Sequence, residues 1–583
     1  MSDHEQQLQV RQGRKKGGLI TMPFIIANEA FEKVSSYGLL PNMILYLMQE
    51  YGMGLAGGTH VLFLWSAATN FMPVVGAFIA DSYLGRFLAI SLGSIISLLG
   101  MILIWLTAMI PKLRAPPCAG CKPASQAQLG VLYTSYALMS VGAGGIRSCS
   151  PGFGADQLDK RDDDSSNKRL LESYFSWYYA AASAAVLVSL TGIVYIQDHL
   201  GWKIGFAVPA ALMFVSASLF LIASPLYVKY DVSTNLFSSF AHVIVASCTK
   251  WKVPFPSQST GDKYYHHDKG STHLVPTNKL RFLNKACIIR SHDEEVASDG
   301  SAVNPWRTCT VDQVEQLKSL IRIIPMWSTS IMMSVNSSQS TFQLVQAEAM
   351  DKHITRSFEI PAGSFNTFLV ITMIVWLPIY DRGIIPVASK IYGKPVRLGV
   401  KLRMGIGLFF CGLSMVVAGV VEHVRRGRAI ETMLLNNNTS EPVITMSAMW
   451  LIPQYVLQGV GEAFNVVGQL EFYYSEFPTS MASLAAALYW LGMAVANLLA
   501  SGILSVVDDV TSKNGRTSWV TSDVNAARLD SYYWVLAALG FANVAYFVVC
   551  SFFYGPCSRE VVKNEESKIE QDMSFEGRVV RRD

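Results

Sequence analysis

Acidic and basic side chains stand inside the first long apolar segment of the chain, where a membrane helix would meet lipid. The stretch NEAFEKVSSYG, residues 28–38, places Glu29, Glu32 and Lys33 within five residues. At about 100° per residue the three fall on one arc of a helix, and Glu29 and Lys33 stand one turn apart. Burying such a group at mid-membrane costs about 2.5–3.5 kcal/mol. We therefore expect this face to line a hydrated cavity or to meet other charges.

The chemistry that suits these residue types is reversible proton binding. Lys33 can neutralise only one of the two carboxylates, and desolvation and a like-charged neighbour both favour the protonated form of the other. Such a carboxyl group, Glu29 or Glu32, can bind and release protons near neutral pH. The alternative is a buried ion cluster that only fixes helix packing.

Three further charges lie in apolar segments. Arg147 ends the fourth segment in GAGGIR, where small residues let helices approach and a guanidinium can hold a carboxylate with two hydrogen bonds. Glu462 and Glu471 lie in the tenth segment, nine residues apart. They are about half a turn out of phase, so one of them should face the cavity better than the other.

The composition is that of an all-α membrane protein that crosses the bilayer many times. The 583 residues are 51% hydrophobic and 15% charged, with a mean hydropathy of +0.30. The net charge of +4 gives no reason to expect nucleic acid as a partner. We count twelve apolar stretches of roughly 20 residues, enough to cross the bilayer as helices. They begin near Leu19, His60, Phe87, Ala127, Tyr174, Trp202, Leu317, Ser364, Val400, Met446, Met481 and Tyr532.

These stretches divide the chain into two halves of six. The predicted parts are an N-terminal tail 1–18, a first bundle 19–228, a linker 229–316, a second bundle 317–554 and a C-terminal tail 555–583. Basic residues gather in the first tail, in the loop after the fourth stretch and in the linker. Because Lys and Arg are enriched in cytoplasmic loops, we expect the linker and both termini to be cytoplasmic.

The two halves repeat one loop motif. GAFIADSYLGR follows the second stretch, and YDRGIIP follows the eighth stretch in the corresponding place. Two similar halves are typical of transporters that rock one bundle against the other around a central site. The residues predicted to form this structural loop are Gly76, Asp81, Gly85 and Arg86, with Asp381 and Arg382 in the second copy.

Two local patterns concern the loops on the opposite side. Asn437 and Asn438 each begin an N-glycosylation acceptor pattern in a loop predicted to be extracellular. Cys118 and Cys121 form a close pair in a Pro-rich loop and could make a disulfide. No further ligands lie near this pair, so no metal site is predicted.

Several motifs together resemble those of one transporter family. They are ExxEK from Glu29, DSYLGRF from Asp81, GAGGIR with FGADQLD from Gly142, VYIQDHLGW from Val194, PWRTCTVDQVEQLK from Pro305, FEIPAG from Phe358, and GVGEAF with EFYYSEFP from Gly459. Over residues 18–552 the sequence resembles the plant nitrate and peptide transporters, a branch of the proton-coupled oligopeptide transporters in the major facilitator superfamily. It is most similar to the first subfamily.

The resemblance implies a fold and roles for single residues. The fold is twelve transmembrane helices in two six-helix bundles. The proton-coupling motif of the family maps to Glu29, Glu32 and Lys33, with Tyr37 close by. The basic residue of the fourth helix, usually Lys, maps to Arg147, and the acidic residue of EFxY in the tenth maps to Glu471; we expect both to bind substrate.

The sequence departs from the family at three places. Arg147 keeps the charge of the usual Lys but cannot pass on a proton. Ser337 stands where some nitrate carriers present a His to the anion, and a hydroxyl can donate a hydrogen bond but cannot become cationic. AAASAAV, residues 180–186, replaces the usual Asn and Gly and should alter packing of the fifth helix.

Aromatic and amide side chains could surround a larger organic anion, although most such groups in a bundle only pack. The candidates are Tyr37, Trp327, Gln339, Phe365, Tyr473, Tyr489 and Trp490.

The function we expect is proton-coupled symport that imports nitrate or a small organic anion by alternating access. The alternatives are transport of di- and tripeptides or of hormones such as gibberellin and abscisic acid, a solute-sensing receptor, and a channel. An enzyme is not expected, because we find no zinc triad, phosphate loop or Ser and His dyad. The proton is the coupling ion and no cofactor is expected. The chain should reside in the plasma membrane rather than the vacuolar membrane, and formation of a homodimer is left open.

Overall fold

The protein is described by a computed structural model, and it is almost entirely helical. Asn437, Asn438, Cys118 and Cys121 lie outside the described residues. The described residues are 17–114, 124–158, 164–229, 236–255, 265–267, 275–289, 295–296, 302–356, 358–393, 398–435, 446–478, 481–513 and 517–555.

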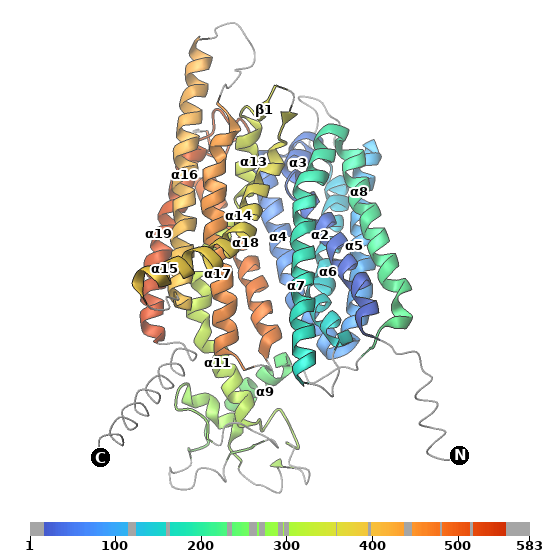
Figure 1. Cartoon of the computed structure of the whole chain (residues 1–583), viewed down its shortest axis with the longest axis vertical. Helices are drawn as coiled ribbons and strands as arrows, with labels where there is room; N and C mark the ends of the chain where they lie inside the picture. Colours follow the sequence, from blue (N-terminus) through green and yellow to red (C-terminus); the bar gives the residue numbers. More distant parts are fainter. Residues whose placement is uncertain are drawn as a thin grey trace.

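The N-terminal half is a bundle of long helices that run along the longest axis of the molecule (Figure 1). Two π-helical turns, η2 (Ala80–Leu84) and η4 (Ser189–Ile193), join consecutive helices without a break. The helices of this half are α2 (Met22–Leu39), α3 (Met43–Tyr51), α4 (Leu55–Ile79), α5 (Gly85–Met109), α6 (Gln126–Leu158), α7 (Asp164–Val188) and α8 (Val194–Ile222), with the 3₁₀ turns η1 (Leu19–Thr21), η3 (Pro111–Leu113) and η5 (Ser224–Leu226).

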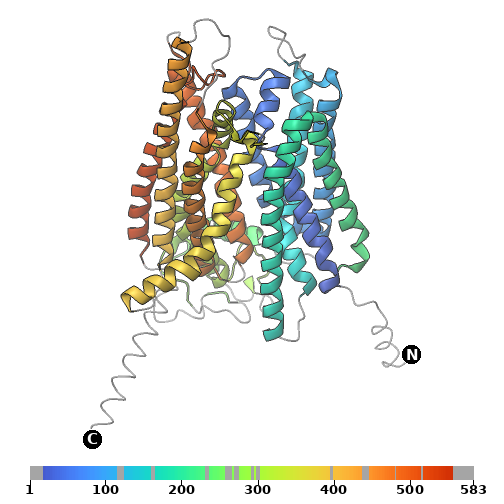
Figure 2. The same cartoon turned by 45° about the horizontal axis from the view of Figure 1, so that its top comes forward.

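The C-terminal half is a second bundle, and Figure 2 shows the two halves side by side, blue to green and yellow to red. The short strands β1 (His353–Thr355) and β2 (Phe358–Glu359) form an antiparallel hairpin, with His353 opposite Glu359. The helices are α11 (Val311–Thr329), α12 (Ile331–Ser337), α13 (Ser340–Glu348), α14 (Asn366–Pro378), α15 (Ile385–Tyr392), α16 (Val400–Leu435), α17 (Ile452–Glu476), α18 (Ala482–Thr511) and α19 (Leu529–Tyr554), with the short turns η8 (Ala362–Phe365), η9 (Ile379–Ile384) and η10 (Ala448–Leu451).

The linker contributes helical elements that lie beyond one end of the bundle, α9 (Leu236–Thr249) and η7 (Arg281–Cys287) (Figure 1). Their apolar residues share a core cluster with the start of α11. Burial raises the pKa of Cys287 and of Cys309 to about 12, so both thiols stay protonated and act as packing groups. We call this end of the bundle the linker side and the opposite end, next to the β-hairpin, the far side.

Helix α11 begins at Val311, six residues before the predicted start at Leu317. A capping box sets this start: Thr310 Oγ1 accepts from Gln313 N, and Gln313 Oε1 accepts from Thr310 N. The predicted start lies too far along the sequence because hydropathy shows where a helix enters an apolar layer. The capping box shows where the helix itself begins.

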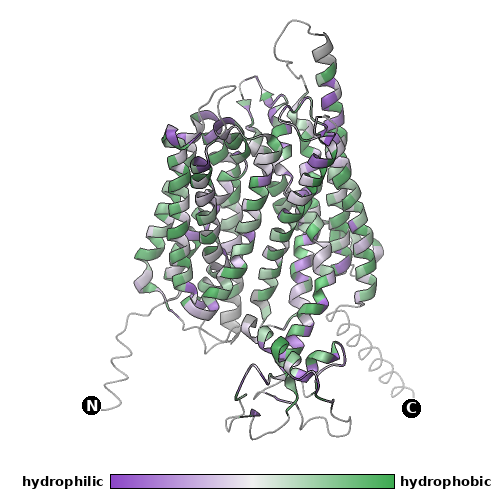
Figure 3. Cartoon of the chain, turned by 180° about the vertical axis from the view of Figure 1, so that it is seen from behind, coloured by the Kyte–Doolittle hydropathy of each residue, from purple (hydrophilic) through white to green (hydrophobic). Residues whose placement is uncertain are grey.

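Helices long and apolar enough to cross a membrane account for much of the described chain. Seven such segments are found among the described residues, and three of them, Leu55–Met109, Ser173–Leu226 and Ala362–Tyr392, contain two helices each. Figure 3 shows the apolar colouring along the bundle and more hydrophilic residues around α9. Helices α2, α11 to α13 and α17 fall outside the seven. The count of twelve stays a prediction.

Glycines allow close helix contacts in the N-terminal half, as the GAGG run predicts. A Cβ on Gly93 of α5 would lie 2.8 Å from the carbonyl oxygen of Gly142 on α6, and a Cβ on Gly76 of α4 would clash with Gly144. Any larger residue would force the helices apart. Helices α4 and α5 are thereby held against α6, which carries Arg147.

The repeated loop motif has the same local structure in both halves. Asp81 lies in the π-turn η2, and Asp381 and Arg382 lie in the π-turn η9. Arg86, just after η2, forms an ion pair of 2.7 Å with Asp156 on α6. This ion pair links the end of the first loop motif to α6.

The two halves meet through polar contacts near the far side. His60 of α4 bridges two hydroxyls of α18, with Nδ1 2.7 Å from Ser501 Oγ and Nε2 2.9 Å from Ser505 Oγ. Ser364 Oγ, at the start of the eighth predicted span, donates to Leu190 O at 2.8 Å. These bonds join the halves at the end remote from α9.

Candidate functional site

The three ionisable residues of the opening stretch lie together on one face of α2, as their spacing predicts. Their exposed fractions are 4% for Glu29, 0% for Glu32 and 8% for Lys33. Lys33 Nζ lies 3.4 Å from Glu29 Oε1 and 3.7 Å from Glu32 Oε2. One ammonium group therefore serves two carboxylates.

Arg147 completes this group from α6. The residue is 9% exposed, and its guanidinium lies with Nη2 3.3 Å and Nε 3.4 Å from Glu32 Oε1. Ser36 Oγ donates to the same carboxylate oxygen at 2.6 Å. Two cations and two carboxylates thus balance in charge, and we call Glu29, Glu32, Lys33 and Arg147 the charge cluster.

The groups of the charge cluster could form shorter and more numerous hydrogen bonds than they do in this conformation. Strong charge-assisted N–H to O bonds measure about 2.7–2.9 Å, so the two contacts of Arg147 with Glu32 are long. Among the described residues, Glu29 Oε2 and Glu32 Oε2 are buried and accept no hydrogen bond. A guanidinium in this position can exchange its carboxylate for another anion at modest energetic cost.

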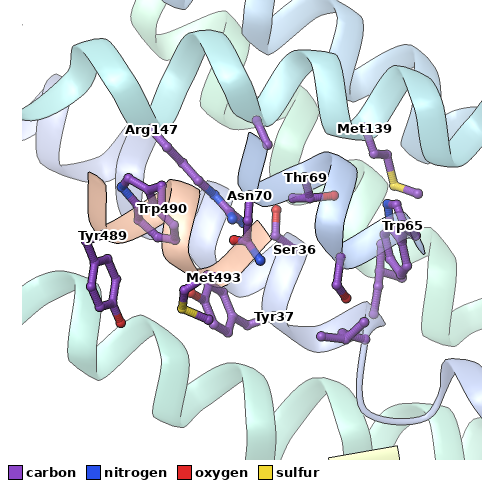
Figure 4. Close-up of a pocket in the computed structure, with 14 residues that line it drawn as sticks. Ser36, Tyr37, Trp65, Thr69, Asn70, Met139, Arg147, Tyr489, Trp490 and Met493 are labelled. Carbon is purple, nitrogen blue, oxygen red and sulfur yellow. The ribbon is translucent and has the colours of Figure 1, made fainter. Parts of the chain in front are cut away.

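A cavity of about 180 Å³ lies beside the charge cluster. Figure 4 shows Arg147 extending from α6 toward Asn70, with Tyr489 and Trp490 contributed by α18. Its walls are largely apolar and aromatic, with a few neutral polar groups. The lining residues are Ser36, Tyr37, Leu39, Leu40, Trp65, Ser66, Thr69, Asn70, Met139, Ala143, Arg147, Tyr489, Trp490 and Met493.

Two aromatic rings cover both cations of the charge cluster. The ring of Tyr37 lies 5.4 Å from Lys33 Nζ and 5.6 Å from Arg147 Cζ. The ring of Trp490, from the other half of the protein, lies 5.8 Å and 5.7 Å from the same atoms. These distances suit cation–π attraction. The C-terminal half therefore contacts the charges of the N-terminal half directly.

The residues expected in the second half are arranged differently from the prediction. Ser337 Oγ donates to Glu462 Oε1, and Gln458 Nε2 donates to both of these oxygens at 3.1 Å. Ser337 is thus held against a carboxylate and is not among the residues that line the cavity. The hydroxyl of Ser337 donates to Glu462 in this conformation, and its role in binding an anion stays a prediction.

Glu471 forms an ion pair with Arg403 of α16. It is not among the residues that line the cavity beside Arg147. Glu471 therefore does not line the cavity that Arg147 lines in this conformation, and its role in binding cargo stays a prediction. Glu462 and Glu471 are half a turn out of phase, and the helix turns Glu471 toward α16 and Glu462 toward α12.

Of the aromatic and amide candidates, Tyr37, Tyr489 and Trp490 line the cavity and the others make packing contacts. Trp327 Nε1 donates to Leu488 O at 2.8 Å, and Gln339 Oε1 accepts from Tyr532 OH at 3.0 Å. Phe365 and Tyr473 are fully buried in core clusters.

Sequence reasoning missed the part of the wall that α4 provides. Trp65, Thr69 and Asn70 lie in a segment that reads as uniformly apolar apart from a few small polar residues. Asn70 was the available signal, because a carboxamide in the middle of an apolar helix usually has a polar neighbour inside the bundle.

Comparison with known proteins now identifies the chain. The profile of the POT family matches residues 87–520, which is most of the sequence. The chain belongs to the POT family. It is a membrane transporter for small molecules, and not an enzyme.

The relatives of this POT family member include plant proteins along nearly the whole chain. It is 55% identical to Protein NRT1/ PTR FAMILY 1.2 of Arabidopsis thaliana over 581 residues, covering 97% of this chain and 95% of the relative. It is also 55% identical to Protein NRT1/ PTR FAMILY 1.1 of the same plant over 555 residues, covering 94% and 93%. The resemblance to the first subfamily of plant nitrate and peptide transporters is confirmed.

Solved structures of POT family proteins share the fold at low sequence identity. The crystal structure of an auto-inhibited POT family peptide transporter aligns with a TM-score of 0.64 and 18% identity, over 91% of this chain and 96% of that one. The POT family transporter PepTSo aligns with a TM-score of 0.65 and 19% identity, over 92% and 98%. The major facilitator fold is confirmed by these alignments.

Proposed function

We propose that the protein imports nitrate or a small organic anion together with protons. The observation that carries the proposal is the position of Arg147. Its guanidinium lines the cavity and at the same time contacts the buried carboxylate of Glu32. One cation is thus available to two anions, the carboxylate of the protein and the cargo.

Protonation of Glu32 provides the switch. A neutral carboxyl group no longer attracts Arg147, and the guanidinium, which stays charged in proteins, then needs another anion. An anion that enters the cavity can take that place, with Ser36, Thr69 and Asn70 as neutral hydrogen-bonding groups nearby. Binding of the proton and binding of the anion therefore favour each other, and this coupling is reciprocal.

Protonation of Glu32 also affects contacts with the C-terminal half of the molecule. Trp490 of α18 packs against Lys33 and Arg147, so a change of charge in the cluster changes the contact between the halves. The contacts of His60 with Ser501 and Ser505 join the halves on the far side. Alternating access requires those contacts to break when the cavity opens to that side.

The cavity favours an anion over a zwitterion among the cargo classes considered. Arg147 is its charged lining residue, and none of the described lining residues is a carboxylate. The ammonium group of a peptide would find no acidic partner there, whereas a single anionic group would find Arg147. Peptides and hormone carboxylates such as gibberellin and abscisic acid are the rivals, and a receptor without net transport is a third. A channel is a fourth, and it would need no proton switch.

Membrane and orientation follow the sequence prediction. We propose the plasma membrane as the location, as the default for such a transporter. We propose that the linker and both termini lie in the cytoplasm, because Lys and Arg gather on that side. A fluorescent C-terminal fusion, probed for protease access in sealed cells, tests both points. Chemical cross-linking in membranes at native expression tests whether two copies associate.

Uptake by oocytes tests the proposal. Labelled nitrate, a labelled dipeptide, gibberellin and abscisic acid are offered at acidic and at neutral external pH, to the wild type and to Glu32→Gln. We expect an anion to accumulate at acidic pH and Glu32→Gln to abolish this pH-driven accumulation. Accumulation by Glu32→Gln with unchanged pH dependence would refute the proton assignment. A voltage step without a pH gradient that drives uptake equally well would instead indicate a channel.

A further inference from the structure

A single threonine of the linker is bonded to α11 through all of its polar groups. The backbone N–H of Thr277 donates to Glu315 Oε1 at 2.9 Å, and its hydroxyl donates to Glu315 Oε2 at 2.9 Å. Its carbonyl oxygen accepts from Lys318 Nζ at 2.8 Å. Lys318 also forms an ion pair of 2.7 Å with Glu315. We call Thr277, Glu315 and Lys318 the linker clamp.

The partners of Thr277 are largely buried, whereas Thr277 itself is at the surface. The side chains of Lys318 and Glu315 are 5% and 14% exposed, and Thr277 and its neighbour Asn278 are both exposed. Residues 275–280 form neither helix nor strand. A segment of this kind opens locally at low cost, so an enzyme can reach the hydroxyl while α11 stays folded.

Two exposed cations follow Thr277 in the chain. Lys279 and Arg281 lie two and four positions after it, and both are exposed. Protein kinases select their substrates partly by the pattern of charges around the acceptor hydroxyl. The linker also lies on the side of the membrane that we expect to be cytoplasmic, where ATP is present. Thr277 is thus an accessible hydroxyl with basic neighbours on that side.

A phosphoryl group on Thr277 would oppose the contacts that now hold the linker. It would carry about 1.5–2 negative charges on the oxygen that lies 2.9 Å from Glu315 Oε2. The esterified oxygen has no proton to donate, so an attractive hydrogen bond is replaced by repulsion between two anions. Lys318 lies between them and cannot neutralise both. Modification of Thr277 therefore favours separation of the linker from α11.

Helix α11 continues from the linker clamp to the wall of the cavity. Trp327 Nε1 of α11 donates to Leu488 O of α18 at 2.8 Å. The next two residues of α18, Tyr489 and Trp490, line the cavity. The linker is therefore in contact with a helix that helps to position the aromatic wall of the site.

We propose that Thr277 is a phosphorylation site and that its modification releases the linker from α11. A protein kinase transfers the terminal phosphoryl group of ATP to Thr277 Oγ1: the new O–P bond forms, the bond to ADP breaks, and the hydroxyl proton passes to solvent. The proposal goes beyond anion symport and takes from the proposed function only the cytoplasmic orientation of the linker. Protease access in sealed cells tests that orientation separately.

Mass spectrometry of the full-length protein purified from plant cells tests whether the site is used. We expect a peptide with phosphate on Thr277, which phosphatase treatment converts to the unmodified peptide and which Thr277→Val lacks. Recovery of the unmodified Thr277 peptide alone, from cells grown with and without nitrate, would overturn the proposal.

Hydrogen exchange in lipid nanodiscs tests the consequence with Thr277→Glu, which places a fixed negative charge opposite Glu315. The backbone of residues 282–289 should exchange at least about tenfold faster than in the wild type. Asn278→Glu, a matched control that adds the same charge at the next exposed position, should exchange like the wild type. Equal exchange in Thr277→Glu and the wild type would refute release of the linker.

A double variant separates charge repulsion from simple loss of the threonine. Adding Glu315→Gln to Thr277→Glu removes one of the two facing anions and leaves Lys318 to pair with the other, so slow exchange should return. Fast exchange that persists in the double variant would refute the electrostatic mechanism. Because these measurements use no cargo, failure of the symport proposal in the oocyte assay would leave their result intact.

Discussion

Arg147 of α6 lies with Nη2 3.3 Å from Glu32 Oε1 of α2, and the same guanidinium borders the cavity. The two residues are 115 positions apart in the chain. In the proposed function, this contact lets the charge state of the buried acid Glu32 decide whether the guanidinium of Arg147 is free to bind cargo. The predictions below test that relationship and the structure around it.

Replacing only one residue of the pair Arg147 and Glu32 should lower the stability of the protein strongly. Replacing both residues should lower it less. Arg147→Met leaves the carboxylate of Glu32 buried with Lys33 as its remaining cation, which should cost about 3–5 kcal/mol of stability. The double variant Arg147→Met with Glu32→Gln should recover part of that loss. Thermal unfolding in detergent measures the stability of the wild type, the two single variants and the double variant. Strictly additive changes in stability would mean that the two residues do not interact. Both variants should lack anion uptake.

Anion uptake should be reduced less by an apolar residue at position 70 than by a negatively charged one. Asn70→Asp places a carboxylate in the cavity wall near Arg147, where it would occupy the guanidinium as cargo does. We expect uptake of the anion to fall at least about tenfold, which corresponds to about 1.4 kcal/mol of lost binding. Asn70→Leu, a matched control of similar size, should raise KM by a smaller factor. Equal effects of the two changes would argue against an anion site at Arg147.

His60 should hold the far side closed. Replacing it with Phe removes two hydrogen bonds to α18, each worth about 1 kcal/mol, and should shift the population toward conformations open on the far side. Spin labels on the far-side ends of α4 and α18 should report a longer distance distribution in His60→Phe. Ser501→Ala with Ser505→Ala, which removes the same bonds from the partner helix, should give the same shift. Unchanged distances in both variants would exclude His60 as a latch.

Much of the architecture could be predicted from the local pattern of apolar, charged and small residues in the sequence. The shared face of Glu29, Glu32 and Lys33, the close approach at the GAGG run and the repeated loop motif were predicted, and the structure agrees with each. Of the twelve predicted apolar spans, the described residues contain seven candidate spans, some of which hold two helices. These features depend on hydropathy and on the period of a single helix, which the order of residues contains directly.

Only the tertiary structure decided which groups meet across helices. It pairs Arg147 with Glu32, turns Glu471 toward Arg403, sets Ser337 against Glu462, and brings Trp490 over the charge cluster of the other half. The sequence determined which face of each helix is polar, because that property is local. The partner of each face depends on the rotation and crossing of every helix in the bundle, and these are set by the packing of all side chains together.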